Sequence, residues 1–179
     1  LTLTNGSSED KKLSVFSYVE WCLWNADDDM KNFQRNLSTG EVEVQDSTIY
    51  HKTEYRERRN HYAIYSVNAK IDGFDTSRDA FLGAYRGADS PEAVENGKCT
   101  NSMASGWSPI ASHQINVELA AGETKTFIFV LGYIENPEEE KWESYGVINK
   151  TRAKEMLAKY QTDDQVEKAF AALQTYWKQ

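Results

Sequence analysis

The sequence predicts a mainly β protein, a large antiparallel β-sandwich followed by two α-helices. From Leu1 to about Ile134, apolar residues alternate with other residues or form short continuous runs, which is typical of strands. Clusters of turn-forming residues separate these runs. After Asn136-Pro137 the apolar residues recur at helical spacing instead. We therefore divide the chain into a sandwich part, residues 1–137, and a helical part, residues 138–179.

The first strands follow from alternation. Leu1-Thr2-Leu3-Thr4 has the pattern of a strand, and from Leu13 to Trp21 both alternating faces carry apolar groups, which predicts a strand deep in a sheet. Glu41 to Val44 alternates cleanly, and the triplet Gln45-Asp46-Ser47 turns the chain into Thr48 to His51. This pair predicts a hairpin with one wet face.

Later strands are expected at His61 to Val67 and at Ile115 to Leu119. The turn Ala121-Gly122-Glu123 leads into Thr126 to Leu131. The continuous apolar run of that last segment predicts a central strand covered on both sides.

Less regular structure is expected between these strands. Asp27 to Asn36 is compatible with a short helix or an irregular loop, because Met30 and Phe33 have helical spacing. Short helical turns are predicted at Ser77 to Leu82 and at Pro91 to Glu95.

Two amphipathic helices are predicted in the helical part. The first has apolar residues at positions i, i+3, i+4 and i+7, namely Ala153, Met156, Leu157 and Tyr160. The second repeats the rule from Val166 to Trp177, and Thr162-Asp163-Asp164-Gln165 matches a capping box at its start. Because these helices need more apolar surface than a sandwich edge offers, and because Leu1 already lies in a strand pattern, we expect a piece of a longer protein.

Composition excludes several classes of function. The 179 residues include 20 basic and 28 acidic side chains, and the net charge of -8 opposes binding to nucleic acid or to an anionic membrane. No segment approaches the roughly 18 apolar residues that span a bilayer. Cys22 and Cys99 have no metal-ligand spacing, so we expect reduced thiols in a soluble, cytoplasmic protein. His51, His61 and His113 are too scattered to indicate a metal site.

The densest group of forked polar side chains lies between Asn32 and His61. Asn32, Gln34 and Arg35 offer amides and a guanidinium group, which can engage adjacent hydroxyls two at a time. Such a cluster is typical of a surface that binds a polyol, although a solvated turn has the same composition. The run Glu54 to Arg59 is equally compatible with a brace for this cluster and with an exposed strand edge.

Several long runs of the sequence resemble the cellobiose phosphorylase family of inverting glycoside phosphorylases. They are FSYVEWCLWNADDDMKNFQRNLSTGEVEV (16–44), STIYHKTEYRERRNHYA (47–63), DGFDTSRDAFLGAYRG (72–87), SGWSPIASH (105–113) and VLGYIENP (130–137). The resemblance implies part of a galactose-mutarotase-like super-sandwich, then linker helices toward an (α/α)6 catalytic barrel. The implied reaction is reversible phosphorolysis of cellobiose to α-glucose 1-phosphate and glucose with inversion. It needs no metal or organic cofactor, since inorganic phosphate is a substrate.

The resemblance also assigns roles to residues. The general acid, an aspartate of the barrel, is expected outside this chain, which therefore carries no catalytic residue and is expected to be inactive alone. Arg35, Gln34 and Asn32 match the loop that approaches the acceptor glucose, with Asn25 close before it. Arg35 is expected to hold sugar hydroxyls through its fork. The family further implies a homodimer to which the sandwich contributes.

Two alternative functions stay open, and several other residues are expected to have only structural roles. A related phosphorylase for another β-linked disaccharide, such as chitobiose or laminaribiose, or for cellodextrin would share the sandwich, and a free-standing carbohydrate-binding module is a second alternative. The tryptophans Trp21, Trp24 and Trp107 are expected in the core rather than as sugar platforms. The acidic runs Asp27 to Asp29 and Glu138 to Glu140 are expected to be solvated.

Overall fold

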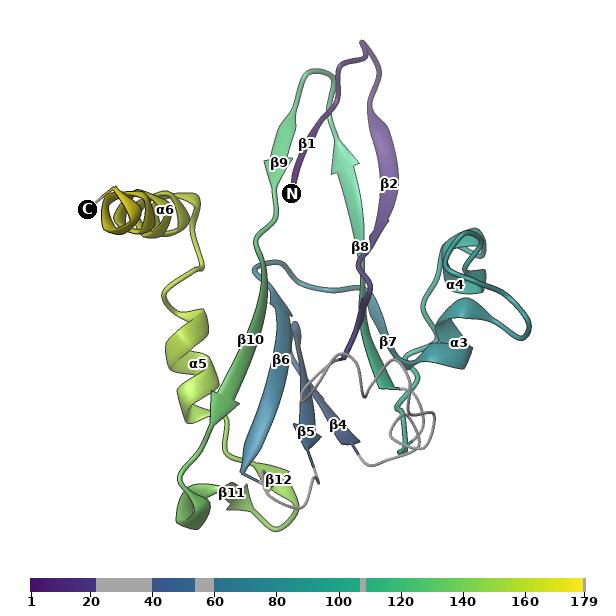
Figure 1. Cartoon of the computed structure of the whole chain (residues 1–179). Helices are drawn as coiled ribbons and strands as arrows, with labels where there is room; N and C mark the ends of the chain where they lie inside the picture. Colours follow the sequence, from purple (N-terminus) through teal and green to yellow (C-terminus); the bar gives the residue numbers. More distant parts are fainter. Residues whose placement is uncertain (22–39, 54–59, 107–108, 179) are drawn as a thin grey trace.

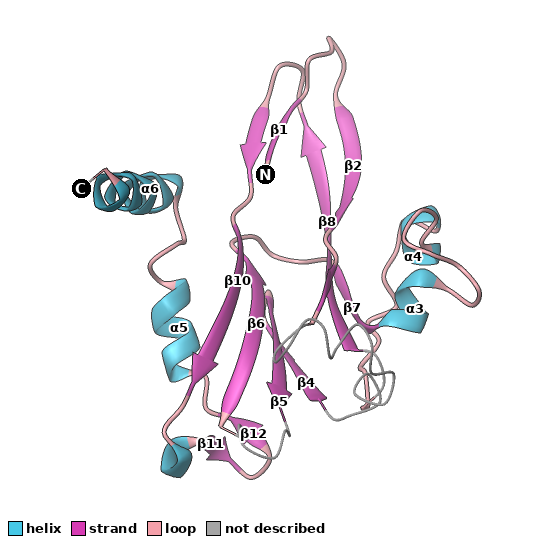
Figure 2. Cartoon of the chain, viewed as in Figure 1, coloured by secondary structure: helices cyan, strands magenta, loops and turns pink. Residues whose placement is uncertain are grey.

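The computed structural model describes residues 1–21, 40–53, 60–106 and 109–178. In these residues antiparallel strands form stacked sheets, and helices follow at the C-terminal end (Figure 1, Figure 2). Every pairing between the named strands is antiparallel. The predicted fold class, mainly β with C-terminal helices, is therefore confirmed.

The first sheet has four strands, which follow one another as a meander except for β10. Their order is β10 (Phe129–Glu135), β6 (His61–Val67), β5 (Thr48–Thr53) and β4 (Gly40–Gln45). All residues of β6 are buried, because both faces of this sheet are covered.

The second sheet is built around the long strand β8 (Pro109–Leu119). On one side β8 pairs with β2 (Lys11–Phe16) and then β3 (Val19–Glu20), and on the other side with β7 (Gly73–Ser77). The two sheets share a core of side chains from both, which are Val42, Ile49, Tyr65, Ala104 and Ala111.

Beyond this core, β2 and β8 extend into a lobe with the small pair β1 (Thr2–Thr4) and β9 (Thr124–Thr126) (Figure 1). The lobe has its own apolar cluster, made of Val67, Ile115, Val117, Leu119 and Phe127. The amide nitrogen of the Asn5 side chain donates to the carbonyl groups of Leu119 and Ala120 at 3.0 Å and links the connection after β1 to the end of β8.

Two short helices, α3 (Arg78–Leu82) and α4 (Glu92–Glu95), follow β7 and lie beside the second sheet. The buried carboxylate of Asp75 holds the returning chain, since it accepts hydrogen bonds from the backbone and hydroxyl groups of Thr100 and Ser102. The predicted helical turns are thus present, but Gly73–Ser77 is a strand that the sequence analysis did not predict.

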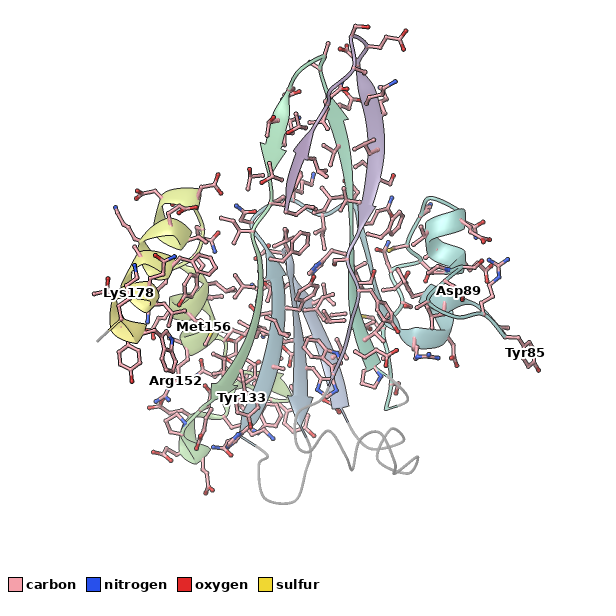
Figure 3. All side chains as sticks on the ribbon, turned by 45° about the horizontal axis from the view of Figure 1, so that its top comes forward. Tyr85, Asp89, Tyr133, Arg152, Met156 and Lys178 are labelled. Atoms are coloured by element: carbon pink, nitrogen blue, oxygen red, sulfur yellow. The ribbon has the colours of Figure 1, made fainter. Side chains whose placement is uncertain are left out.

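The second face of the first sheet is covered by the segment that follows β10. This segment contains the 3-10 helix η1 (Glu138–Glu140), the hairpin β11 (Trp142–Ser144) with β12 (Val147–Ile148), and α5 (Thr151–Leu157). Its core cluster is Tyr50, Tyr62, Ile64, Ile134, Ile148, Ala153 and Leu157. In Figure 3, Arg152 and Met156 of α5 lie beside β10, and Arg152 donates to the carbonyl of Glu135 at 2.8 Å.

The last helix, α6 (Asp163–Trp177), begins with the predicted capping box. The Thr162 hydroxyl accepts from the Gln165 amide, and the Gln165 side chain accepts from the Thr162 amide at 3.0 Å. Its apolar side chains Phe170, Leu173 and Trp177 are exposed in the described chain, with Trp177 at 76%.

Three strand predictions are wrong in detail. Leu13 to Trp21 is not one deep strand: it breaks at Ser17, whose hydroxyl accepts from the His113 amide at 3.0 Å, and β2 lies at an edge. Thr126 to Leu131 is not one central strand either, because β9 pairs with β1, whereas β10 pairs with β6 alone among the described strands and leaves Leu131 64% exposed.

The third correction concerns the hairpin of β4 and β5. It forms with the two-residue turn Asp46-Ser47 rather than the predicted triplet, and its second face is only partly wet: β11, β12 and α5 cover Tyr50 and Lys52, whereas Glu41 and Gln45 stay exposed. Residues 142–148, which fall in the part predicted to be helical, form the hairpin β11–β12 instead.

Candidate functional site

Strands of both sheets end on one side of the molecule, which we call the open end. In the first sheet the pairs Gly40 with Thr53 and His61 with Glu135 close the strands there. In the second sheet the pairs Glu20 with Ile110 and Ser77 with Pro109 do so. A bridge between Glu41 and Ser105 and a ring stack between Trp21 and His51, with centroids 5.4 Å apart, join the two groups.

The sequence-predicted site residues Asn25, Asn32, Gln34 and Arg35 lie outside the described residues, as do Trp24, Trp107 and the run from Glu54 to Arg59. The residues that flank these segments are described. Trp21, Gly40, Thr53, Asn60, Gly106 and Pro109 all belong to strands or turns at the open end. The residues that flank the segment with the predicted site residues, and those that flank the run from Glu54 to Arg59, thus lie on one side of the molecule.

The inner wall of the open end is apolar and holds a buried imidazole. Trp21 packs with the core shared by the two sheets, as predicted, and its ring stacks on His51. Neither ring nitrogen of His51 has a hydrogen-bond partner in the described part of the chain, and burial lowers its pKa to about 4. The ring is therefore neutral near pH 7, and it serves as packing rather than as a proton acceptor.

A carboxylate and a guanidinium group lie side by side at the rim. Glu20 of β3 accepts a hydrogen bond from the Tyr18 hydroxyl and another, at 3.0 Å, from Nε of Arg78. The hydrogen bond from Tyr18, then the one from Arg78, hold the pKa of Glu20 below its usual value despite partial burial. A charged carboxylate beside a forked donor is an arrangement that can engage sugar hydroxyls.

The outer face of the open end contains a group that we call the lysine–glutamate cluster, Glu41, Glu43, Lys52, Glu143 and Lys150. Lys52 Nζ lies 2.7 Å from Glu41 Oε2, 3.1 Å from Glu43 Oε1 and 2.9 Å from the carbonyl of Gly146. Lys150 Nζ lies 2.6 Å from Glu43 Oε2, 3.3 Å from Glu143 Oε1 and 3.1 Å from the carbonyl of Ile148. The two lysine side chains are only 2% and 3% exposed.

Electrostatics favour the charged forms of Lys52 and Glu43 in this cluster. Burial opposes the charged form of Lys52, but hydrogen bonds to Glu41 and Glu43 outweigh it and raise the pKa of Lys52. Burial also opposes ionisation of Glu43, yet hydrogen bonds from Lys150, from the Ile148 amide at 2.9 Å and from Lys52 lower its pKa. The carboxylate of Glu43 is therefore shared by two ammonium groups and one backbone amide.

The sequence profile of the glycosyl hydrolase 94 supersandwich domain matches residues 1–163. The chain belongs to this family. It is 28% identical over 177 residues, 98% of its length, to the N,N'-diacetylchitobiose phosphorylase of Vibrio furnissii, of which it covers 20%. It is 27% identical over 134 residues to the solabiose phosphorylase of Paenibacillus borealis, covering 71% of the chain and 16% of the relative.

A third relative is named for a different activity. The cyclic beta-(1,2)-glucan synthase of Rhizobium meliloti (strain 1021) is 29% identical over 140 residues, which is 78% of this chain and 5% of the synthase. This supersandwich domain spans about a fifth of the length of the phosphorylase from Vibrio furnissii.

The lysine–glutamate cluster of the supersandwich domain was missed by sequence reasoning, which assigned Glu43 to a wet face. A signal was present in the hairpin register, because a two-residue turn places Glu41 opposite Lys52 across the strands. Lys150 could not be found in this way, since its approach to Glu43 is set by tertiary packing of the β11–β12 segment.

Other predicted features of the supersandwich domain have simple outcomes. Cys99 is a free, buried thiol whose pKa burial raises to about 12, whereas Cys22 lies outside the described residues. Glu138 to Glu140 are exposed, as expected of solvated charges, and Asp27 to Asp29 are not described.

The described residues contain neither a metal-holding group nor a membrane-spanning helix. No group of three His, Cys, Asp or Glu side chains is placed there to hold a metal ion. No described helix is long and apolar enough to cross a membrane.

Proposed function

We propose that this supersandwich domain belongs to an inverting phosphorylase of a β-linked disaccharide, with cellobiose as the substrate. In the proposed reaction, inorganic phosphate attacks the anomeric carbon, a carboxylic acid outside this chain protonates the departing oxygen, and α-glucose 1-phosphate and glucose result. The observation that carries the proposal is the family match over residues 1–163, together with the phosphorylases among the relatives.

In this proposal the chain forms one wall of the acceptor-sugar site. Arg35 holds sugar hydroxyls through its fork, Gln34 and Asn32 add amide contacts, and Asn25 lies near them. The open end supports this proposal, because the segment that contains these residues leaves the sandwich at Trp21 and returns at Gly40. The run from Glu54 to Arg59 leaves and returns at the same end and is proposed to brace the site.

Assembly and compartment are proposed with the same reaction. A phosphorylase of this kind is proposed to be a cytoplasmic homodimer, in which the sandwich takes part in the contact between subunits. Glucose, cellobiose and phosphate are then its partners, and nucleic acid and membrane are not. The net charge of -8 agrees with this choice, because it disfavours polyanionic surfaces.

A second candidate substrate is N,N'-diacetylchitobiose. The observation that favours it is the relative from Vibrio furnissii, which is named for phosphorolysis of this sugar and matches 98% of this chain. An identity of 28% is too low to assign this relative's substrate to the present chain. Both sugars therefore belong in the test.

The test uses the full-length protein that carries this domain. We expect phosphate-dependent release of α-glucose 1-phosphate from cellobiose, little release of it from laminaribiose or cellodextrin, and little release of α-N-acetylglucosamine 1-phosphate from N,N'-diacetylchitobiose. In the synthetic direction, replacing Arg35 by Ala is expected to raise the KM for the acceptor sugar by about 10 to 100-fold, since a charge-assisted hydrogen bond contributes about 1.5–3 kcal/mol. The KM for the sugar phosphate should stay unchanged.

The matched control is Arg86→Ala. Arg86 is a partly exposed arginine that pairs with Glu95 of α4, away from the open end. Equal acceptor kinetics in Arg35→Ala and in this control would refute the assigned role of Arg35. Phosphorolysis of chitobiose in place of cellobiose would select the second candidate, and no phosphorolysis of any of these sugars would refute the proposed function.

A further inference from the structure

The lysine–glutamate cluster joins two parts of the chain that are far apart in the sequence, the hairpin of β4 and β5 and the segment from β11 to α5. Glu41 and Glu43 come from β4, Lys52 from the end of β5, and Lys150 from the residue before α5. Lys52 also reaches the carbonyl of Gly146 in the turn between β11 and β12. The cluster therefore connects the open end of the first sheet to the segment that leads into the helices.

The energetics of the cluster favour orientation over stability. Two buried ammonium groups lose most of their hydration, and their attraction to carboxylates often does no more than offset that loss. An apolar replacement of the same volume would often be as stable or more so. What charged groups add is directional hydrogen bonding, and here Lys52 and Lys150 each make contacts to two carboxylates and one carbonyl.

Glu43 is the central member. Its two carboxylate oxygens separate the two lysines, with Oε1 toward Lys52 and Oε2 toward Lys150, and Oε1 also accepts from the Ile148 amide at 2.9 Å. One side chain therefore sets the position of β12 and of the start of α5 relative to β4. The other two carboxylates, Glu41 and Glu143, are more exposed and each contact a single lysine.

The cluster lies next to the strand ends to which the proposed acceptor-site segment is attached. Lys52 directly precedes Thr53 and Glu41 directly follows Gly40, and these two neighbours form the last pair of the β4–β5 ladder. Chain segments 22–39 and 54–59 attach to that pair. A shift of β4 relative to the helical part would move this attachment point, and a displacement of about 1 Å at a binding group can cost up to about 100-fold in rate.

We propose that Glu43, Lys52 and Lys150 are positioning residues for the acceptor-sugar site, which hold the open end of the sandwich in a set orientation to the helical part. This inference rests on the proposed function. The cluster touches no substrate in it and acts only through the strand end that it holds. Binding of the sugar phosphate, which is assigned to the part of the enzyme outside this chain, does not depend on that strand end.

The experiment measures the synthetic reaction of the full-length protein with Glu43→Gln and with Lys150→Met. Glu43→Gln keeps the shape of the side chain but removes the charge between the lysines, which retain Glu41 and Glu143 as partners. We expect the KM for the acceptor sugar to rise about tenfold in each variant, with the KM for the sugar phosphate within about twofold of wild type. Glu43→Asp, which keeps the charge, should restore part of the acceptor affinity.

The matched control is Glu118→Gln. Glu118 also pairs with a lysine of a neighbouring strand, Lys12, at 2.6 Å, but this pair is exposed and lies in the lobe away from the open end. Its kinetic constants and melting temperature should match those of wild type, because exposed ion pairs contribute little. The melting temperature of each cluster variant is measured alongside, and if Glu43→Gln does not fold, Lys150→Met decides the outcome.

Two results would overturn the inference. An active wild type whose cluster variants show lower melting temperatures or lower kcat, but the same acceptor KM as the control, would make the cluster merely structural. That result would leave the proposed function intact. A wild type that phosphorolyses no disaccharide would instead refute the proposed function and this inference with it.

Discussion

His51 and His113 are the clearest cases in which a single residue conflicts with its surroundings. Burial lowers the pKa of each imidazole to about 4, and neither ring has a full set of hydrogen-bond partners in the described part of the chain. His113 retains one contact, between its Nδ1 and the Ser17 hydroxyl at 3.2 Å. Both rings pack by stacking instead, His51 on Trp21 and His113 on Tyr65.

This burial predicts a loss of stability in mild acid. Because the folded pKa of each histidine lies below the unfolded value of 6.5, the unfolded chain binds more protons between about pH 6.5 and pH 4. The contribution of the two histidines to the free energy of unfolding is therefore fully present above pH 6.5, and it is lost as the pH falls through that window. Between pH 7 and pH 5 we expect a loss of about 2 kcal/mol for each histidine, as measured by urea unfolding at the two pH values.

The matched variant is His51→Met, which removes one titrating ring. It is expected to be less stable at pH 7, since the stack on Trp21 is lost, but its loss between pH 7 and pH 5 should be smaller by about 2 kcal/mol. A pH dependence identical to that of wild type would show that His51 is not the source.

For single residues, the sequence indicated the chemistry of a side chain better than its burial in the fold. The forked side chains Asn32, Gln34 and Arg35 were proposed from their type and from a family resemblance, and they stay a prediction because the structure does not describe them. Glu43 was assigned to a wet face, and no environment was predicted for Lys52. Their burial depends on β11, β12 and α5, which are about 100 residues further along the chain, and a local pattern cannot contain that information.

Among the elements, those whose signals are local were predicted well. The capping box before α6 involves four consecutive residues, and its two hydrogen bonds are present. The hairpin of β4 and β5 forms where it was predicted, because a short turn joins strands that are adjacent in the sequence.

The capping box predicts a measurable effect on α6. Thr162→Ala removes the side-chain oxygen that accepts from the Gln165 amide, and such a change destabilises a helix by about 1 kcal/mol. We expect faster hydrogen exchange of amides in the first turns of α6, with little change in β6 or β8.

Thr175→Ala is the control for that measurement. Thr175 lies in the same helix, but its hydroxyl donates to the carbonyl of Ala171 and caps nothing. Because alanine is the better helix former, exchange in α6 should be equal or slower in this variant. Equal protection of α6 in Thr162→Ala and wild type would argue against the cap.

Strands that break or change partner were not predictable. Residues 13–21 and 126–131 each contain apolar positions on both faces, which in a single strand would indicate deep burial. In the structure each run is divided between two pairings, and its apolar residues serve different clusters: Val15 the lobe, and Val19 the core between the sheets. Periodicity reports that a residue is apolar, but not which sheet receives it.

For the whole molecule, the family match and the antiparallel sheets agree with the fold class predicted from pattern alone. The division between residues 137 and 138 stays a prediction. The acceptor-site proposal needs groups from outside this chain, whereas a free-standing carbohydrate-binding module would not. This difference can be measured on the chain itself.

We expect titration of residues 1–179 with cellobiose to give no heat beyond dilution in isothermal calorimetry. One wall of a site offers few of the contacts that offset the cost of immobilising a sugar. The full-length protein under the same conditions should bind. Measurable binding by the isolated chain, at an affinity near that of the full-length protein, would favour the binding-module alternative.

The position of β10 has a practical consequence for work with the domain in solution. Among the described strands it pairs only with β6, so the backbone groups on its other side form an open edge beside the exposed side chain of Leu131. Open edges of this kind attract strands of other molecules. Domain preparations are therefore expected to self-associate as concentration rises, and a lysine in place of Leu131 is the change we would make first to keep them monodisperse.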